Sequence, residues 1–391
     1  MRPVKIVHII TKLELGGAQQ NTLFTLGHLD RDLFRPYLIT NNEGILVPEA
    51  LALKGVRTFL LPELIREINP LMDLRALFKI KGILRKIKKG NSSPMIVHTH
   101  SSKAGIVGRW AARYAGADVI IHTIHGFGFH DYQPSPVRGF FIFLERLTAK
   151  ITDTFIVVSR ANMEKGVDLG IFPPQKAVLI RSGIELEEFI GVRVKTEEKK
   201  GELGVDPDLP LITMIGCLKP QKAPLDYVEV AHLLLQEREA TFIMVGDGVL
   251  RGRVERRVQE LGLGKRFKLL GWRRDIPEIL AATDIFVLTS LWEGLPRVLP
   301  QAMTMGIPIV ATRVDGTPEA VVHGVNGFLA EPRDIKGVTR RVVYLLDHPK
   351  EAKDLGERGR EMVEEFNIWS MLREQEQLYR RLLREKGRGL E

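Results

Sequence analysis

Short, nearly continuous apolar runs alternate with helix-like segments along most of this protein, and they form two series. The first series consists of residues 4–10, 37–40, 95–100, 118–125 and 154–159. The second consists of residues 211–216, 241–246, 267–271, 284–290 and 307–312. Runs this apolar are typical of parallel strands buried on both faces, and the helices between them favour right-handed βαβ units. The pattern predicts an α/β fold of two doubly wound, Rossmann-like domains facing a cleft.

The break between the two series predicts where the domains divide. Residues 184–210 are charged and rich in turn-forming residues, and no buried strand is evident among them. We interpret them as a linker and the start of the second domain, which gives a first domain of 1–188 and a second of 189–368. Residues 369–391 form a highly charged helical segment that either lies on the surface or packs back on the first domain.

Composition restricts the class of protein. The 391 residues, 44% of them hydrophobic, suffice for two domains with full cores. The single cysteine, Cys217, rules out a disulfide framework and a cysteine-based zinc site, which fits a reducing compartment. The N-terminal apolar run is too short for a secretory signal, and no apolar run reaches about 18 residues. We therefore expect a cytoplasmic protein without a membrane span.

The net charge of +9 indicates either a generally basic surface or attraction to phosphate-bearing ligands or an anionic membrane. We expect no nucleic acid partner. The segment 75–89 is a basic amphipathic helix, with an apolar face of Leu77, Ile80, Leu84 and Ile87. Its opposite face carries Arg75, Lys79, Lys86 and Lys89. Such a helix either packs its apolar face on the core or lies peripherally on the inner face of the cytoplasmic membrane.

The stretch "DIFVLTSLWEGLPRVLPQAM", residues 284–303, joins a predicted strand to a predicted helix through Glu293. Pro296 suits the first position of that helix. The helix dipole alone explains a carboxylate there, yet it also keeps the carboxylate ionised and able to accept hydrogen bonds from sugar hydroxyls. Gly294 and Leu295 would present backbone N–H groups to a phosphate. Both interpretations of Glu293 stay open at this point.

Three other loops follow predicted strands. "IGCLKPQKAP" places Lys219 and Lys222 beside the start of a helix, where a diphosphate is favoured over plain solvent exposure. In "LELGGAQQ" (13–20), Gly17 would let a ligand approach the backbone closely. "VGDGVLRG" (245–252) resembles a dinucleotide fingerprint, but its spacing is irregular and a tight strand-to-helix turn is the favoured interpretation.

Histidines gather in two segments, 98–105 and 122–130. His98 and His100, two apart on a predicted strand, share a face, so a metal site is conceivable. No carboxylate or cysteine joins them at ligand spacing, so we expect no metal. His125 ends a predicted strand, where an acid–base or hydroxyl-binding role is expected.

Taken together, these segments resemble glycosyltransferase family 4, with its GT-B fold. The resemblance is carried by "GGAQ" (16–19), "HTHSSKAG" (98–105), His125 with Gly126, "VVSRAN" (157–162), "IRSGIE" (180–185), "GCLKPQKAP" (216–224), "VGDG" (245–248) and "EGLPRVLPQAMTMGIPIVATRVDGTPE" (293–319). It implies transfer of a sugar from a nucleotide-sugar donor with retention at the anomeric carbon, and no obligatory metal or cofactor. "HTHSSKAG" and "RVLPQAM" are most similar to bacterial members that build cell-surface polysaccharides, which implies a lipid-linked or glycan acceptor.

The resemblance also implies residue roles. Lys222 would bind the donor diphosphate, Glu293 would hold hydroxyls of the donor sugar, and His125 would line that sugar beside the reacting centre. Further donor contacts are implied for Gly17, Lys219, Gly294, Leu295, Pro296, Val298 and Gln301. Ser101 and Lys103 are the acceptor-side candidates.

Two positions depart from the family pattern. Cys217 stands where the family usually has an arginine beside the diphosphate, and Gln301 stands where it usually has a glutamate on the ribose. Lys219 is a candidate for the missing charge, and the Gln301 amide still pairs with a diol. Two alternatives stay open: a nucleotide-sugar 2-epimerase, because such enzymes share this two-domain architecture, and a catalytically silent assembly partner, which Cys217 and Gln301 suggest.

Overall fold

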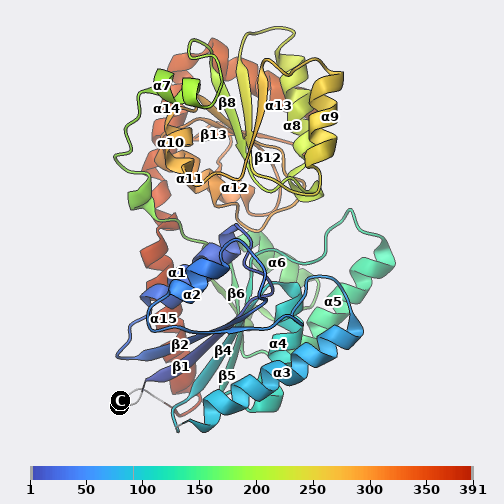
Figure 1. Ribbon diagram of the computed structural model, residues 1–391, viewed down its shortest axis with the longest axis vertical. Helices are drawn as coiled ribbons and strands as arrows, with labels where there is room; N and C mark the ends of the chain where they lie inside the picture. Colours follow the sequence, from blue (N-terminus) through green and yellow to red (C-terminus); the bar gives the residue numbers. More distant parts are fainter. Residues whose placement is uncertain (1–2, 91, 389–391) are drawn as a thin grey trace. The chain divides into compact units, whose positions relative to one another are not determined.

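The computed structural model describes residues 3–90 and 92–388, which form two compact units. The first unit takes in the chain up to Gly183 together with the segment that begins at Ile368, and the second is Ile184–Asn367. The sequence placed the corresponding divisions after residues 188 and 368. Each unit has one parallel sheet with helices packed against it (Figure 1).

The first unit contains seven strands in the order β3-β2-β1-β4-β5-β6-β7, and every pairing is parallel. The strands are β1 (Val4–Ile9), β2 (Phe34–Thr40), β3 (Arg57–Leu60), β4 (Met95–His100), β5 (Val119–Ile124), β6 (Thr154–Val157) and β7 (Ala177–Leu179). The helices are α1 (Gly17–His28), α2 (Val47–Ala52), α3 (Pro70–Lys89), α4 (Ser102–Ala115), α5 (Ser135–Ala149), α6 (Arg160–Asp168), the short η1 (Pro174–Lys176) and α15 (Ile368–Glu385).

The second unit contains six parallel strands in the order β10-β9-β8-β11-β12-β13. The strands are β8 (Leu211–Ile215), β9 (Thr241–Val245), β10 (Phe267–Gly271), β11 (Ile285–Leu288), β12 (Ile309–Thr312) and β13 (Gly327–Ala330). The helices are η2 (Leu186–Glu188), α7 (Thr196–Glu202), η3 (Pro220–Lys222), α8 (Pro224–Leu234), α9 (Arg251–Glu260), α10 (Ile276–Ala281), α11 (Val298–Thr304), α12 (Thr317–Ala320), α13 (Ile335–Asp347), α14 (Pro349–Glu361) and η4 (Val363–Phe366).

Both sheets are doubly wound, because the strand order reverses once in each, between β1 and β4 and between β8 and β11. Ligands of such sheets bind outside the carboxyl ends of the strands at the point of reversal. All ten predicted strands are present. The three that were missed, β3, β7 and β13, lie at sheet edges, where a strand needs neither the length nor the uniform apolarity of a central one.

Helix α15 belongs to the core of the first unit. Its residues Ile368, Met371 and Tyr379 are buried in one cluster with Ile6 and Ile121 of the sheet. The end of the protein thus closes one face of a sheet built from its beginning. Residues 389–391 of the predicted terminal segment lie outside the described residues.

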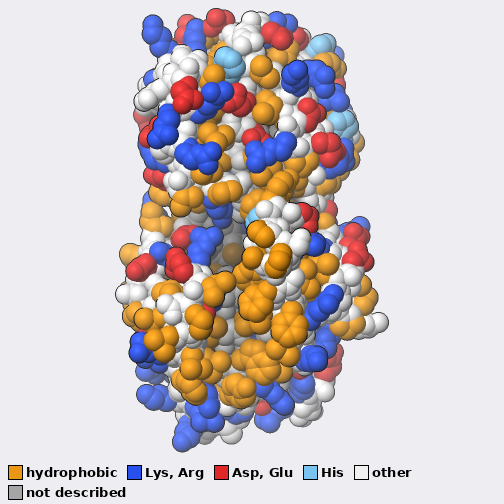
Figure 2. Space-filling view, turned by 90° about the vertical axis from the view of Figure 1, so that its right-hand side faces the viewer, with side chains coloured by type: hydrophobic (Ala, Val, Ile, Leu, Met, Phe, Trp, Pro, Cys, Tyr) orange, Lys and Arg blue, Asp and Glu red, His pale blue; other side chains and the backbone are white. Residues whose placement is uncertain are grey.

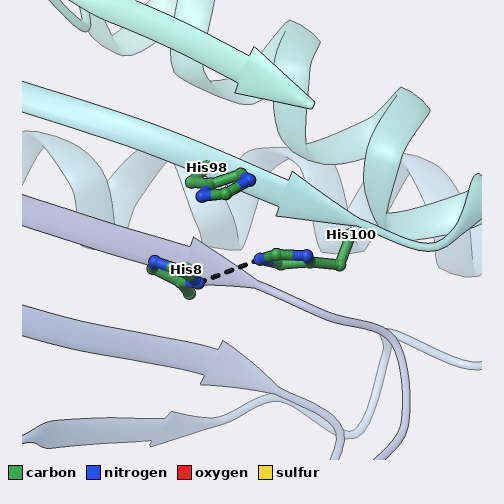
Figure 3. A group of neighbouring side chains, drawn as sticks. All are labelled: His8, His98 and His100. Atoms are coloured by element: carbon green, nitrogen blue, oxygen red, sulfur yellow. Dashed lines mark hydrogen bonds between the residues drawn. The ribbon is translucent and has the colours of Figure 1, made fainter. Parts of the chain in front are cut away.

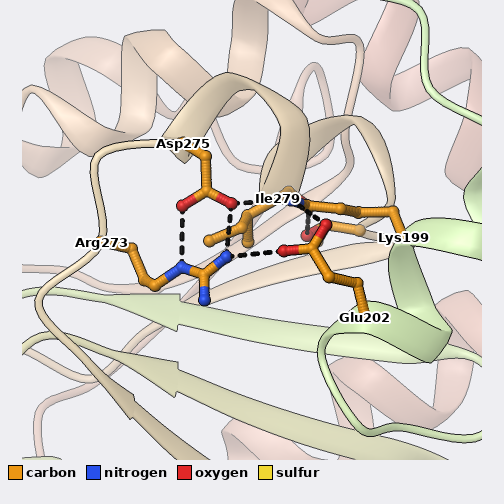
Figure 4. Close-up of polar contacts among 6 residues, drawn as sticks. Lys199, Glu202, Arg273, Asp275 and Ile279 are labelled. Carbon is orange, nitrogen blue, oxygen red and sulfur yellow. Dashed lines mark hydrogen bonds and ion pairs between the residues drawn. The ribbon is translucent and has the colours of Figure 1, made fainter.

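An ion-pair network ties α7 to the loop before α10 (Figure 4). Arg273 contacts Asp275 through two bonds, Nε to Oδ1 at 2.8 Å and Nη2 to Oδ2 at 2.6 Å. Lys199 Nζ lies 2.7 Å from Asp275 Oδ2, and Glu202 accepts from both cations at 2.9 Å. Arg273, and then Lys199, hold the pKa of the Asp275 carboxyl well below its usual range, despite partial burial. Ion pairs therefore fix α7, the first α-helix of the second unit, against the loop before α10.

Helix α3 contains the basic amphipathic segment. The apolar residues Ile80, Leu84 and Ile87 are buried in the core and Leu77 is partly buried against it, so this face of the helix packs inward and is not itself open to a membrane. The basic face is exposed: Arg75, Lys79, Lys86 and Lys89. No helix in the described parts of the protein is long and apolar enough to cross a bilayer.

Candidate active site

Glu293 lies just after β11, beside β8, where the strand order of the second sheet reverses. Its Oε1 is paired with Lys222 Nζ and accepts a hydrogen bond from Ser290 Oγ at 2.6 Å. The side chains of Lys222 and Glu293 are only 14% and 6% exposed. A charge pair this buried is held away from bulk water, and it sits at the edge where a doubly wound sheet binds its ligand.

Further hydrogen bonds fix the Glu293 carboxylate. Gln221 Nε2 donates to Glu293 Oε2 at 3.3 Å and to the Trp292 carbonyl at 2.9 Å. The Glu293 N–H donates to Asp315 Oδ2 at 2.7 Å. The loops after β8, β11 and β12 therefore hold one another, and the carboxylate is already in place before a ligand arrives.

Two glycines after β9 let the loop after β8 come close. A Cβ atom on Gly246 would lie 2.1 Å from the Gly216 carbonyl oxygen, and one on Gly248 would lie 2.6 Å from that of Leu218. Gly246 also has a φ of +130°, which other residues rarely adopt. "VGDG" is thus a tight turn that packs against the neighbouring loop, which agrees with the interpretation that the sequence analysis favoured over a dinucleotide fingerprint.

The segment after Glu293 leaves backbone donors unused. Within the described chain, nothing accepts a hydrogen bond from the N–H of Gly294 or Leu295. Helix α11 begins at Val298, so the prediction that Pro296 opens it was wrong by two residues. The reason is that Pro296 provides the carbonyl that accepts the first bond, from the Leu299 N–H at 3.1 Å.

Gln301 lies in the first turn of α11 and is half-buried. Its amide makes no hydrogen bond to any described residue, so both its donor and its acceptor remain for a ligand. Lys219 precedes η3 and Lys222 is its last residue, and the backbone N–H of Lys222 donates to the Lys219 carbonyl at 3.0 Å. Both lysines and Cys217 therefore lie in the same loop, which connects β8 to α8.

Arg297 is a further cation in this region. Burial lowers the pKa of its guanidinium to about 10, while Glu185 and Glu188 oppose the shift. It stays charged at neutral pH, and it lies two residues after the unused N–H of Leu295. The sequence analysis did not assign it a role.

In the first unit, Gly17 opens α1 and Ser101 follows β4, both at the carboxyl edge of the sheet. Ser101 Oγ lies 2.7 Å from Thr11 Oγ1. The backbone of Ser101 has φ 59° and ψ 157°, a region almost restricted to glycine that costs on the order of 1–3 kcal/mol. Lys103 Nζ is paired with Asp73 Oδ1 of α3 at 2.6 Å, so an acceptor group would have to compete with that carboxylate.

His125 lies directly after β5, and its Nε2 is 3.1 Å from His100 Nδ1. His100, His98 and a third ring, His8 of β1, each offer a nitrogen within 4.8 Å of the others (Figure 3). Burial lowers the pKa of His8 to about 3 and those of His98 and His100 well below their usual range, so all three are neutral at pH 7. Neutral imidazoles are metal ligands, but every ring nitrogen of these three is already in a hydrogen bond within the protein.

A small cavity with a mixed polar and apolar lining lies beside His100 and His125. Its wall includes Asn21 of α1, which is 4% exposed. Neither atom of the Asn21 amide has a hydrogen-bond partner among the described residues. A buried amide without a partner is uncommon, and it marks this cavity as a place for a water molecule or a ligand hydroxyl.

Comparison with known proteins decides the family. The model of "Glycosyltransferase Family 4" matches residues 15–188, and that of "Glycosyl transferases group 1" matches residues 195–362. An Escherichia coli enzyme, UDP-Gal:alpha-D-GlcNAc-diphosphoundecaprenol alpha-1,3-galactosyltransferase, is 35% identical over 348 residues, which are 88% of each chain. The protein belongs to glycosyltransferase family 4.

Other comparisons place this glycosyltransferase among bacterial relatives and GT-B structures. The Campylobacter jejuni N,N'-diacetylbacillosaminyl-diphospho-undecaprenol alpha-1,3-N-acetylgalactosaminyltransferase is 27% identical over 72% of this chain and 74% of its own. Anabaena HepE, solved with UDP and glucose, has a TM-score of 0.81 at 20% identity over 96% of this chain and 99% of its own. Sucrose-phosphate synthase from Thermosynechococcus elongatus has the same TM-score at 23% identity, over 98% and 100%. The predicted GT-B fold is confirmed.

The sequence analysis of this glycosyltransferase missed several residues that hydrogen-bond, directly or through one another, to the predicted site residues. Asp315 and Ser290 hold Glu293, and His8 and Tyr379 lie in one hydrogen-bonded group with His125. Asp315 lies in the quoted segment 293–319, which offered a signal. Tyr379 offered none, because it lies 254 positions along the sequence from His125 (379 − 125).

Proposed function

We propose that this glycosyltransferase moves a hexose from a nucleoside diphosphate sugar to a saccharide carried on a lipid diphosphate, with retention at the anomeric carbon. The support for the acceptor is the pair of relatives whose names specify sugars on diphosphoundecaprenol. Both are alpha-1,3-transferases, and the Escherichia coli enzyme uses a UDP sugar. These relatives are transferases, so the epimerase alternative has no support from them.

The observation that carries the proposal is the Lys222–Glu293 pair at the reversal point of the second sheet. Glu293 accepts hydrogen bonds from donor-sugar hydroxyls. Lys222 has three N–H donors, so it can keep Glu293 and still bind a phosphate oxygen. The N–H groups of Gly294 and Leu295 add neutral donors to the diphosphate, with Pro296 and Val298 shaping the turn around it.

The reaction breaks the bond between the anomeric carbon and the β-phosphate oxygen and forms a bond from that carbon to the acceptor oxygen on the same face. The acceptor hydroxyl gives its proton to the departing phosphate oxygen. Negative charge grows on the diphosphate as it leaves, so fixed cations and N–H donors aimed at it lower the barrier. No step requires a metal, and we propose that the enzyme is metal-independent.

We also propose roles in the reaction for residues of the first unit. His125 is proposed to hydrogen-bond a hydroxyl of the transferred sugar, and Gly17 to let the diphosphate approach the backbone at the start of α1. Ser101 and Lys103 are proposed to contact the acceptor. Lys103 would then exchange its Asp73 partner for an acceptor phosphate.

Cys217 and Gln301 are proposed to reduce charge at the donor site without removing its function. Lys219 and Arg297 are cations of the same unit that can offset the missing arginine. The unused amide of Gln301 can bind the ribose diol by neutral hydrogen bonds. These are weaker than carboxylate bonds, so donor affinity is the expected cost.

We propose further that the enzyme docks peripherally on the inner face of the cytoplasmic membrane through an apolar patch on the first unit. Figure 2 shows hydrophobic side chains gathered on the face that α3 and α5 form. The patch consists of Ile68, Leu71, Leu74, Phe78, Val137, Phe140 and Phe143, each between 43% and 65% exposed. The exposed basic residues of 75–89 border it and suit anionic headgroups. The patch thus refines the prediction that 75–89 contacts the membrane.

The test is a panel of radiolabelled UDP sugars incubated with synthetic undecaprenyl diphosphate saccharides, with and without EDTA. Product with the alpha configuration, formed at the same rate with EDTA, supports the proposal. A beta product or dependence on added metal contradicts the mechanism. Failure to bind any nucleotide sugar by calorimetry would favour the silent assembly partner instead.

A further inference from the structure

A continuous hydrogen-bonded chain of side chains, here called the imidazole chain, leads from His125 into the core of the first unit. His125 Nε2 meets His100 Nδ1 at 3.1 Å, and His100 Nε2 meets His8 Nδ1 at 2.9 Å. His8 Nε2 then meets the Tyr379 hydroxyl at 3.3 Å. That hydroxyl lies 2.7 Å from His98 Nδ1, and His98 Nε2 lies 2.6 Å from Thr123 Oγ1. The rings of His8, His98 and His100 converge from neighbouring strands in Figure 3.

The members of the imidazole chain cannot choose their tautomers independently. His8, His98 and His100 are neutral because they are buried, and a neutral imidazole has one N–H donor and one bare nitrogen acceptor. If one ring donates toward Thr123, its neighbour must donate the same way, since two N–H groups or two bare nitrogens cannot face each other. Between His125 and Tyr379 only two orders satisfy every link: the donors of His125, His100 and His8 all point toward Tyr379, or all point toward His125. The Tyr379 oxygen can accept two hydrogen bonds but its hydroxyl donates only one, so its own contacts decide whether the order continues to Thr123.

The contacts of Tyr379 select one of these orders. Its hydroxyl has a single hydrogen and two imidazole neighbours. The 2.7 Å separation from His98 Nδ1 is typical of an O–H donor, whereas 3.3 Å from His8 Nε2 suits a weaker bond accepted by the oxygen. A third neighbour, Gln375 Oε1, is at 3.5 Å, too far to compete. Tyr379 therefore donates to His98 and accepts from His8, so the donors point toward Thr123.

We propose that Tyr379 is a positioning residue that, through His8 and His100, places the ring proton of His125 on Nε2 and makes Nδ1 a hydrogen-bond acceptor. The consequence for transfer rests on the proposed function, in which His125 contacts a hydroxyl of the donor sugar. With its ring proton on Nε2, His125 accepts from that hydroxyl through Nδ1, whereas the opposite tautomer would present an N–H. Through Tyr379, the helix α15 thereby determines whether Nδ1 of His125 accepts a hydrogen bond from its ligand or donates one to it.

The main test is Tyr379→Phe, with the ring nitrogens of His125 observed by nitrogen-15 NMR of histidine-labelled protein and assigned with a His125→Asn variant. Removing the hydroxyl leaves the His8 Nε2–H without an acceptor. A buried N–H without a partner is costlier than a bare ring nitrogen, so His8, His100 and His125 reverse, with a shift of about tenfold in tautomer ratio. In the wild type, His125 Nε2 carries the proton; in the variant, Nδ1 carries it.

Tyr227→Phe is the matched control. Tyr227 is a buried tyrosine of the second unit whose hydroxyl donates to the carbonyls of Ile212 and Ile243 at 2.8 and 3.2 Å. Its loss should leave the His125 signals and kcat unchanged. Thr123→Val is the second test: it removes the last acceptor of the imidazole chain, so it should reverse the same rings even if Tyr379→Phe does not fold.

Kinetic measurements separate the claim that the imidazole chain sets the His125 tautomer from the claim that His125 contacts the donor sugar. Tyr379→Phe should lower kcat/KM for the donor by about tenfold, because the tautomer that accepts from the sugar hydroxyl becomes the minor one. Unchanged His125 signals in both Tyr379→Phe and Thr123→Val overturn the imidazole chain, and so does a stoichiometric metal on the purified enzyme. Reversed signals with unchanged kcat/KM for the donor support the imidazole chain and overturn instead the role of His125 in the proposed function.

Discussion

Lys222→Met separates the structural from the catalytic part of the buried ion pair. The substitution keeps most of the side-chain volume and removes the charge. Glu293 keeps its hydrogen bonds from Ser290 and Gln221, at 2.6 and 3.3 Å, but it loses its cation while only 6% exposed. Removing one partner of a buried pair costs about 3–5 kcal/mol, because the other charge stays buried. The two remaining bonds place the expected loss of unfolding free energy at the lower end, about 3 kcal/mol.

The effect on turnover is separate. If Lys222 contacts the leaving diphosphate, its removal leaves developing negative charge without its cation, and kcat should fall by about 10²–10³-fold. A double variant, Lys222→Met with Glu293→Gln, replaces the pair by neutral groups. It should recover most of the lost stability, since no lone charge remains, and none of the lost turnover.

The assays are urea unfolding followed by tryptophan fluorescence, for which Trp292 beside Glu293 is a reporter, and release of nucleoside diphosphate. Lys195→Met is the control, because Lys195 and its partner Glu198 are 79% and 70% exposed and such pairs contribute little. If Lys222→Met unfolds within about 0.5 kcal/mol of the wild type, the range expected of a surface substitution, the buried pair is refuted. A kcat within about twofold of the wild type would refute the catalytic assignment even if stability falls as expected.

Four further outcomes are expected. Arg109→Met should lower the unfolding free energy by about 3–5 kcal/mol, because Arg109 is fully buried and its Nη2 lies 2.7 Å from Oε2 of Glu145, whose side chain is only 9% exposed. An unchanged urea midpoint would contradict this. Burial lowers the folded-state pKa of four imidazoles, those of His8, His98, His100 and His122. Their contribution to stability is complete above the unfolded pKa of about 6.5 and is lost as the pH falls, by up to about 5 kcal/mol per pH unit for four rings that stay neutral. Urea unfolding between pH 7 and 5 measures that slope, and a flat profile below pH 6 would be inconsistent with neutral buried rings. Gly246→Ala should weaken donor binding by at least tenfold, because its Cβ would lie 2.1 Å from the Gly216 oxygen and push the Lys222 loop away, whereas Gly252→Ala meets no atom within 4 Å and should bind like the wild type. Phe78→Ser combined with Phe140→Ser should release the enzyme from anionic vesicles in sedimentation while leaving the binding of soluble donor unchanged; equal sedimentation would remove the patch as the membrane contact.

The sequence by itself determined the fold class, because parallel strands buried on both faces must be apolar along their whole length. Central strands such as β1, β4 and β8 carry that signal, whereas the edge strands β3 and β7 are partly exposed and do not. It also predicted that Lys222 and Glu293 lie near each other, since both lie in loops that follow strands and such loops meet at one edge of a parallel sheet.

Only the tertiary structure decided which side chains meet. That Glu293 is held by Gln221, Ser290 and Asp315 depends on three loops from separate strands, whose distances the strand order sets but local pattern does not. The contact of Tyr379 with His8 and His98 depends on α15 returning to the first sheet after an entire second unit has been built. Sequence periodicity reports the burial of one helix or strand at a time. A hydrogen bond between distant segments forms only when the fold has brought both segments into place.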